Sequence, residues 1–286
     1  MFQVKVMSVK EYSFAVDLAN TVGWGMEEAD FRFNQFLEPE GCLVLFEGLV
    51  PVGLATCVSF EKLGWFGNFV VRSNYRGHGG GRLLLEHAIS YLRSRGVESI
   101  GLYAYPWLVE FYGKFGFKKD IELKVMHNVC LQMGNNYNYK EEGVVSKVGV
   151  CGDFSGLSSF DVRFFGVDRS RVLKGIMEGK DNYCYVLRDG GKVVGYVLAK
   201  DYGHVVEVGP LVCCPDRSEG VFELLQTMLC GLGGREVWLY LPQEQKGVEE
   251  FLFGVGFRKK FSLSRMFLGE PKIQRGIYLG ESLERG

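Results

Sequence analysis

The segment from Phe69 to Leu85 contains the residues whose types and spacing are best suited to chemistry. An apolar stretch leads into a short basic turn, and the turn into six residues, RGHGGG, at positions 76–81. Glycines allow φ above zero and close approach of the backbone, so that successive amides can converge on an oxyanion. A helix that begins there adds its free amides and the positive end of its dipole. The pattern predicts an anion-binding loop.

Two other glycine motifs do not fit this segment. No Gly-Lys-Ser/Thr follows the glycines, as a Walker loop requires. The dinucleotide pattern G-x-G-x-x-G is not met by a βαβ unit with an acidic residue about 20 positions further on. The loop is therefore not explained by either of these nucleotide-binding motifs.

The elements around the loop must hold it in place. A strand near 65–71 precedes it, and a helix over 80–95 follows, with its apolar residues on one face and Gly96 as a stop. Upstream we expect a strand at 3–7, helices at 9–21 and 27–36, and strands near 42–46 and 53–60. Hairpin strands followed by a strand–helix–strand unit predict the α/β (α+β) class, with a mixed, mostly antiparallel sheet flanked by helices.

In this context the segment resembles the GNAT superfamily of acetyltransferases, whose cofactor motif is R/Q-x-x-G-x-G/A between a strand and a helix. The residues that match are Arg76, Gly77, His78, Gly79, Gly80 and Gly81. Residues 105–117, YPWLVEFYGKFGF, look like the family's later helix, which ends in Y-x-x-x-G-F. The resemblance covers roughly residues 2–130.

The resemblance implies acetyl-CoA as the acyl donor and a role for each matching residue. The backbone amides of Arg76–Gly81 would hold the diphosphate, and Phe69, Val70 and Val71 would pair with the pantetheine arm like an extra strand. The Val71 amide would stabilise the thioester oxyanion, a contribution of about 3 kcal/mol in comparable sites. Tyr112 would protonate the departing thiolate. Packing in the core is the alternative role for this tyrosine.

One position departs from the family pattern. Many members carry Asn seven residues before the tyrosine, where it contacts the cofactor, and this chain has Tyr105. A subgroup of two-domain members also lacks the Asn. No general base is identifiable: His78 is expected to point to solvent, Glu61, Asp17 and Glu27 are open alternatives, and so is removal of the proton through water.

The chain contains an internal repeat. Five landmarks recur in the same order at offsets of 137 to 142 positions, which makes chance resemblance improbable. They begin with Gly53 and Gly195 and end with Gly116-Phe117 and Gly256-Phe257. A polar, Asn- and Gly-rich stretch at 133–143 separates the copies. We expect two tandem GNAT-like domains, a catalytic one at 1–138 and a second at 139–286.

The second copy is expected to have lost the cofactor site. At an offset of 141, residues 76–81 become RSEGVF at 217–222, which brings in a carboxylate and a phenylalanine. Tyr112 becomes Leu252. The second domain would then shape the acceptor cleft or stiffen the first domain. Glu207, inside an apolar strand, could contact a cationic acceptor or face solvent.

The composition and net charge limit which classes of protein and partner are consistent with the sequence. The chain has 286 residues, 47% hydrophobic and 23% charged, and 33 basic against 34 acidic side chains give a net charge of −1. This fits a globular protein and disfavours nucleic acid as a partner. No signal sequence or membrane-length apolar run stands out, so we expect a cytoplasmic protein, monomeric or homodimeric.

The cysteines are scattered and lack a matching ligand pair, so neither a disulfide framework nor a metal site is expected. The leading hypothesis is an N-acetyltransferase for the amine of a small-molecule or amino-acid-like acceptor. The alternatives are a non-catalytic acyl-CoA-binding sensor and a purely structural or partner-binding module. The acceptor is not readable from the sequence, because one fold serves many acceptors.

Overall fold

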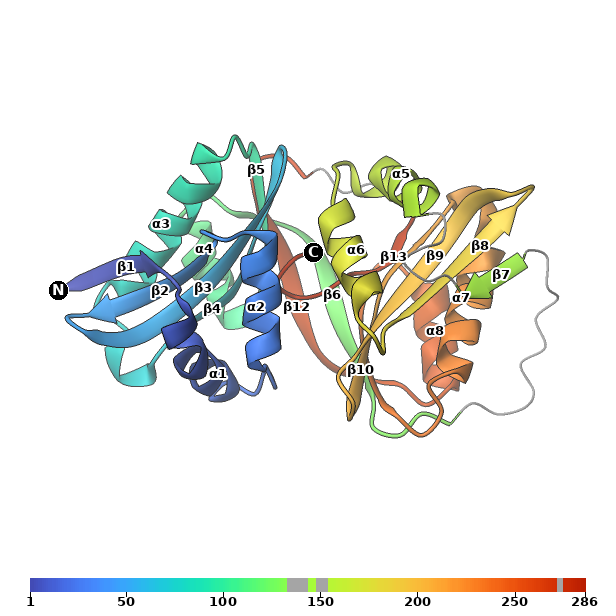
Figure 1. Cartoon of the computed structure of the whole chain (residues 1–286), viewed down its shortest axis with the longest axis horizontal. Helices are drawn as coiled ribbons and strands as arrows, with labels where there is room; N and C mark the ends of the chain where they lie inside the picture. The colour runs from blue at the N-terminus through green and yellow to red at the C-terminus, as the bar shows by residue number, and fades with distance from the viewer. Residues whose placement is uncertain (133–143, 148–153, 272–274) are drawn as a thin grey trace. The chain divides into compact units, whose positions relative to one another are not determined.

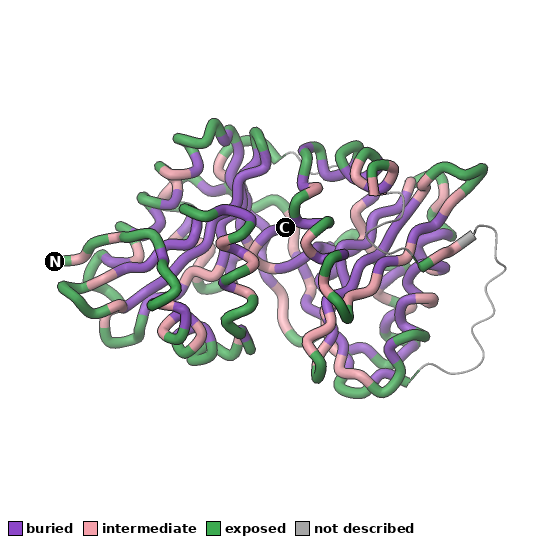
Figure 2. The backbone as a smooth tube through the Cα atoms, in the orientation of Figure 1, coloured by how far each residue is buried: buried purple, intermediate pink, exposed green. Residues whose placement is uncertain are grey.

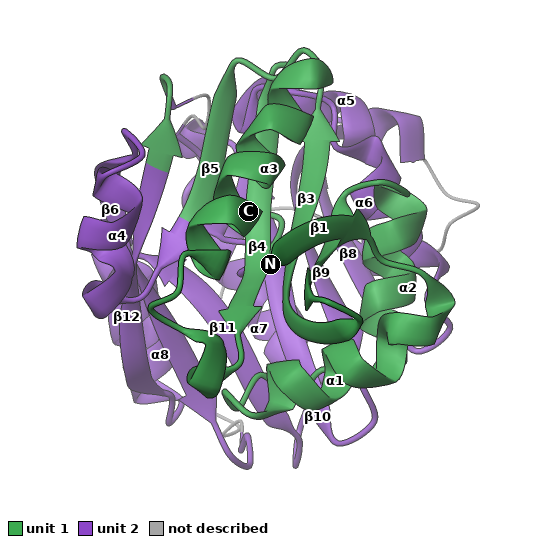
Figure 3. Ribbon diagram, turned by 90° about the vertical axis from the view of Figure 1, so that its left-hand side faces the viewer, with its two compact units in different colours: residues 1–102, 267–270, 284–286 green, residues 103–266, 271–283 purple. Residues whose placement is uncertain are grey.

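The computed structural model describes residues 1–132, 144–147, 154–271 and 275–286 (Figure 1). The chain divides into two compact units, which Figure 3 colours separately. Unit 1 comprises Met1–Leu102, Phe267–Glu270 and Glu284–Gly286; unit 2 comprises Tyr103–Met266 and Pro271–Leu283. The domain boundary expected near residue 138 lies outside the described residues.

The sheet of unit 1 is built from consecutive hairpins and one crossover. Its strands lie in the order β1 (Phe2–Val6), β2 (Cys42–Glu47), β3 (Val50–Phe60), β4 (Leu63–Val71) and β5 (Ser99–Ala104). The first four pair antiparallel. β5 runs parallel to β4, because α3 (Gly80–Ser94) carries the chain back between them.

Three helices flank this sheet, and each turns an apolar stripe inward. α3 buries four apolar side chains at helical spacing, Leu84, Leu85, Ala88 and Leu92. α1 (Tyr12–Asn20) follows a short 3₁₀ turn, η1 (Val9–Glu11), and α2 (Glu28–Leu37) buries Phe31 and Leu37. Figure 2 shows the strands largely buried and the connecting turns exposed. A 3₁₀ turn, η2 (Ser73–Tyr75), lies between β4 and α3.

Unit 2 repeats the pattern with additions. Its strands lie in the order β12 (Arg258–Leu268), β6 (Lys118–Asn128), β11 (Glu236–Pro242), β10 (Val205–Cys213), β9 (Lys192–Asp201), β8 (Tyr183–Asp189) and β7 (Val144–Lys147). A short strand, β13 (Ile277–Leu279), pairs with β10. The parallel pair is β10 with β11, joined through α7 (Glu219–Cys230).

The remaining helices belong to unit 2. They are η3 (Pro106–Leu108), α4 (Val109–Gly113), α5 (Phe154–Phe165), α6 (Ser170–Glu178), η4 (Pro215–Arg217) and α8 (Lys246–Gly254). The core between α7, α8 and the strands is largely aliphatic, and Leu224, Leu239 and Leu252 are fully buried in it. Helix–sheet packing of this kind confirms the predicted α/β (α+β) class with a mixed, mostly antiparallel sheet.

A strand of the first repeat lies in the sheet of unit 2. β6 comes from the first half of the sequence, yet it lies between β11 and β12, which belong to the second repeat. It pairs antiparallel with β11 from Leu123 opposite Pro242 to Asn128 opposite Val237. The compact units therefore do not coincide with the halves of the repeat.

Candidate active site

The last part of β4 has a free edge within unit 1. Its parallel pairing with β5 covers only Leu63–Trp65. Further along, Ala55 of β3 stands opposite both Asn68 and Phe69, a bulge at which Asn68 has a φ of 48°. Bulges bend a strand and re-aim its groups. Val70 and Val71 pair or align with β3 on one side, and no described strand of unit 1 pairs with them on the other.

The backbone amide of Val71 points to that free edge. Arg72 N donates to Val52 O at 2.8 Å, which makes 72 and 52 a hydrogen-bonded pair of the antiparallel ladder. Neighbouring residues of a strand direct their amides to opposite sides, so the amide of Val71 faces away from β3. Its carbonyl accepts from Arg76 Nε at 2.7 Å on the same side. A donor is thus available where a ligand could run alongside β4.

The glycines of the loop after η2 are there for different reasons. Gly77 and Gly79 have φ values of 79° and 86°, where a side chain would be strained. A Cβ on Gly80 would lie 2.7 Å from Leu45 Cδ2, so this glycine allows the start of α3 to pack on β2. A Cβ on Gly81 would lie 3.3 Å from the Phe69 ring. The side chain of His78 is exposed, as expected.

The amides of this loop are open. Among the described residues, those of Gly77–Gly81 have no backbone hydrogen-bond partner, and residues 76–79 are exposed. Arg76 differs from the expectation, because its amide closes a turn on Ser73 O at 3.3 Å. Five consecutive amides at the start of a 15-residue helix are the kind of arrangement that could hold an anion such as a diphosphate.

Tyr112 lies in unit 2, on α4, and is 3% exposed. Gly116 has a φ of 89°, which ends the helix and turns Phe117 back onto the tyrosine, with the two rings edge-to-face at 5.9 Å. This is the structural reason for the Y-x-x-x-G-F pattern. Burial raises the pKa of the Tyr112 phenol, so it keeps its proton at neutral pH. The group is suited to donate a proton.

Tyr105 occupies the position where many family members have Asn. It precedes η3 and stacks on Trp107, with ring centroids 4.7 Å apart and planes 12° apart. Its other ring neighbour is Phe261 of β12, at 5.7 Å. This position therefore offers an aromatic surface in place of an amide.

The three carboxylates considered as general bases lie in different parts of unit 1. Glu61 lies in the turn before β4, and the nine residues from Leu63 to Val71 span about 26 Å at the usual strand rise. Glu61 therefore lies at the opposite end of β4 from the Val71 amide. Glu27 caps α2, and Asp17 is exposed on α1. None of the three is placed as an evident base.

The second copy lacks the loop by deletion as well as substitution. In the strands, Gly53 pairs with Val71 and Gly195 with Cys213, an offset of 142. In the helices, Gly220 packs on Leu187 as Gly80 packs on Leu45, an offset of 140. The connection is thus two residues shorter, and the residue-by-residue alignment of this loop at 141 is wrong. The inference that the cradle is lost does not depend on that alignment.

The strand edge that is open in the first copy is occupied in the second. β13 pairs with β10 at Leu211 and Val212, the counterparts of Phe69 and Val70. Cys213 N, the counterpart of the Val71 amide, donates to Gly276 O at 2.9 Å. The chain itself fills the place that an extended ligand would take.

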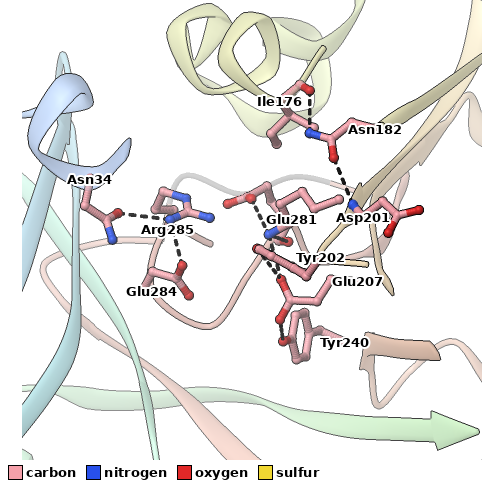
Figure 4. Close-up of polar contacts among 11 residues, drawn as sticks. Asn34, Ile176, Asn182, Asp201, Tyr202, Glu207, Tyr240, Glu281, Glu284 and Arg285 are labelled. Carbon is pink, nitrogen blue, oxygen red and sulfur yellow. Dashed lines mark hydrogen bonds and ion pairs between the residues drawn. The ribbon is translucent and has the colours of Figure 1, made fainter. Parts of the chain in front are cut away.

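Glu207 on β10 is only partly exposed and belongs to a polar cluster (Figure 4). Lys200 Nζ lies 2.9 Å from its Oε2 and 2.8 Å from Glu281 Oε1. Tyr240 Oη donates to Glu207 Oε1 at 2.5 Å. Burial alone would raise the pKa of Glu207, but Lys200 and Tyr240 outweigh it and hold the pKa below its usual range. Neither sequence interpretation foresaw this ion pair.

Sequence reasoning missed the partners of Glu207, and no local signal could have found them. Lys200 and Tyr240 come from different strands, and Glu281 follows β13. A second missed cluster lies nearby in unit 2, where Arg169 makes two 2.9 Å hydrogen bonds to Asp161 and both are buried.

Three further findings concern metal-ligating groups, membrane-spanning helices and thiols. The described residues include no group of three or more His, Cys, Asp or Glu placed to hold a metal ion. None of the helices in the described ranges is long and apolar enough to cross a membrane. Burial raises the pKa of the Cys42, Cys184 and Cys213 thiols to about 12, which keeps them protonated.

Two family profiles match the sequence. The profile described as Acetyltransferase (GNAT) family matches residues 12–117, and the one described as Acetyltransferase (GNAT) domain matches residues 157–277. The matches fall on the two copies of the repeat. No curated protein matches the sequence.

Solved structures are similar over nearly the whole chain. A candidate acetyltransferase from Pyrococcus horikoshii has a TM-score of 0.83 at 22% identity, over 100% of this chain and 96% of the other. A GCN5-related N-acetyltransferase from Sphaerobacter thermophilus has a TM-score of 0.67 at 18% identity, over 98% of each chain. A tandem GNAT protein from the clavulanic acid biosynthesis pathway has a TM-score of 0.65 at 12% identity, over 94% of this chain and 98% of the other.

Proposed function

Because the chain belongs to the GNAT superfamily of acetyltransferases, with two GNAT domains in tandem, we propose that it moves an acetyl group from acetyl-CoA to the amine of a small-molecule or amino-acid-like acceptor. The observation that carries the proposal is the set of open amides at Gly77–Gly81, next to the free edge of β4. One feature can hold a diphosphate and the other an extended chain.

The first half of the chain supplies the donor site in this proposal. The amides of Gly77–Gly81 hold the diphosphate, and β4 from Phe69 to Val71 pairs with the pantetheine arm. The amide of Val71 then donates to the thioester oxygen as charge develops on it. Arg76 contributes chiefly through its side chain, which holds the Val71 carbonyl.

The reaction is a direct transfer. The amine nitrogen attacks the thioester carbon, a C–N bond forms, and the C–S bond breaks with its electron pair on sulfur. Tyr112 gives its proton to the departing thiolate, and the proton of the amine leaves through water. A phenol whose pKa is raised by burial is a proton donor rather than a base, which supports this role.

The second GNAT domain takes part on the acceptor side in this proposal. Lys200 forms ion pairs with the carboxylates of Glu207 and Glu281, so these three side chains together carry a net charge of one negative unit. The side chain of Glu207 is 24% exposed and can contact a cationic amine. We propose Glu207 as an acceptor-binding residue and Tyr105 as an aromatic contact of the donor.

Isothermal titration with acetyl-CoA tests the donor site. Gly79→Val places a β-branched residue at a φ of 86° and should weaken binding at least about tenfold. Gly48→Val imposes similar strain at the β2–β3 turn, at a φ of 60°, and should leave the affinity unchanged. Absence of acetyl-CoA binding by the unmodified chain would remove the proposal.

A further inference from the structure

The first turn of α7 borders a small cavity in unit 2. Its lining includes the apolar Leu187 and Val194, the backbone of Gly220, and five charged side chains, Arg188, Asp189, Arg217, Glu219 and Glu223. The volume is about 20 Å³, enough for one guest of the size of water. The cavity lies where α7 begins, the counterpart of the loop that opens α3.

Glu223 makes this cavity unusual. The residue is 8% exposed, and among the described residues no hydrogen-bond partner exists for its Oε2 atom. A buried carboxylate oxygen without a donor is costly, so buried acids are normally paired. The counterpart in α3 at the structural offset of 140 is Leu83, which is apolar and 37% exposed. The acid is therefore specific to the second copy.

The charge around the cavity is not balanced. Arg188 and Arg217 bring two positive charges, and the three carboxylates bring three negative ones. Arg217 is engaged by Asp189 in an ion pair. Glu219 lies one helical turn before Glu223, so the two side chains share one side of the helix, and both line the cavity, Glu219 exposed and Glu223 buried.

We propose that this cavity binds a primary ammonium group, with Glu223 as the buried acceptor and Glu219 at the entrance. An ammonium group has the size of water and supplies several N–H donors with the charge that is missing. No set of three metal-ligating side chains is present among the described residues, so an N–H donor fits better than a coordinated metal ion. The site is separate from the donor site and does not rest on the proposed activity.

Thermal unfolding of the full chain tests this site. Ammonium chloride and methylammonium chloride should raise the melting temperature by about 3 °C relative to equal concentrations of potassium and tetramethylammonium chloride, at tenfold excess over Kd. This increase in melting temperature should disappear in the Glu223→Gln variant. It should persist in the control variant Glu250→Gln, because Glu250 is an exposed glutamate of α8.

The salt series separates the sources of the group. A higher melting temperature in ammonium chloride alone identifies the free ammonium ion as the ligand. A higher melting temperature in both ammonium chloride and methylammonium chloride identifies a small alkylamine. Equal stabilisation by potassium or tetramethylammonium overturns the proposal in the unmodified chain, whether or not Glu223→Gln folds. A titration with acetyl-CoA on the same samples reports on the donor site independently.

Discussion

The side chain of Tyr112 is held by its own chain neighbours. Phe117 packs on the ring because Gly116 can adopt a φ of 89°, and the phenol is left 3% exposed. The same arrangement recurs around Leu252 and Phe257, where Gly256 has a φ of 92°. The packing is thus common to both copies, and the hydroxyl is found in the first alone. A hydroxyl that packing does not require is a candidate for chemistry.

Tyr112→Phe should lower the rate of thiol release about 10²-fold or more while the affinity for acetyl-CoA is retained. The raised pKa of Tyr112 adds a pH criterion, because the protonated phenol is the active form and persists to high pH. The unmodified chain should show no loss of rate from this group up to about pH 10. Release of thiol measured across a panel of amines checks the rate, and titration checks the affinity.

Phe117→Leu serves as the packing control, since it removes the ring contact and keeps the hydroxyl. An equal rate for Tyr112→Phe and the unmodified chain would assign the tyrosine to packing. Acetyl-CoA binding without thiol release from any amine would favour the sensor hypothesis.

At the scale of elements, one carboxylate ties together three parts of unit 1. Glu38 ends α2, accepts from Ser59 N on β3 at 2.9 Å, and accepts from Tyr91 Oη on α3 at 2.6 Å. Arg95 lies 3.6 Å away. Burial would raise the pKa of Glu38, but the hydrogen bonds from Ser59 and Tyr91 outweigh it and lower the pKa. This tie holds the helix that follows the glycine loop.

Glu38→Gln should reduce the free energy of unfolding by about 2 kcal/mol at pH 7, as for hydrogen bonds to a buried charge. A lowered carboxyl pKa means that the stabilisation is present above the unfolded pKa, about 4.3, and is lost as the pH falls through the folded value. The difference between the variant and the unmodified chain should therefore shrink at acid pH. Denaturant unfolding at pH 7 and pH 3 measures it.

Glu40→Gln is the matched control, because Glu40 is exposed two residues further on. It should change stability by less than about 0.5 kcal/mol at either pH. A difference for Glu38→Gln that stayed constant with pH would show that its charge does not contribute.

At the scale of the whole molecule, the two copies share a framework but differ at the strand edge and the loop that follows it. The first copy has an open strand edge beside Val70 and Val71, and a glycine loop whose amides have no backbone partner among the described residues. In the second copy the loop is two residues shorter and β13 pairs with the edge of β10. The Cys213 amide there donates a hydrogen bond to Gly276 O. The open edge and the loop of unpartnered amides therefore occur together in the first copy, which leads us to expect a single site for an extended thioester carrier.

The chain should therefore bind one equivalent of acetyl-CoA. The stoichiometry comes from titration of the full chain at a protein concentration well above Kd. The Gly79→Val variant should bind acetyl-CoA more weakly at this one site, and its titration should show no second binding site. A stoichiometry of two would contradict the assignment of the second copy.

The sequence alone determined the local features. The spacing of RGHGGG after an apolar strand is enough to predict the anion-binding loop, because backbone geometry at Gly77 and Gly79 depends on residue type. The repeat and the α/β class follow from patterns that each copy carries within itself, and the match of two family profiles confirms both. The resemblance to the family's Y-x-x-x-G-F pattern made Tyr112 a candidate through its distance from Gly116-Phe117, and its role in the reaction stays a prediction.

The tertiary structure decided which segments lie together. That β6 enters the sheet between β11 and β12, and that β13 fills the edge of β10, depends on hydrogen bonds between distant backbones, which leave no local mark in the sequence. The partners of Glu207 come from separate strands for the same reason. Local backbone conformation depends on the residue types within a short segment. The partner of a strand depends instead on which distant strand edge its backbone and side chains fit best.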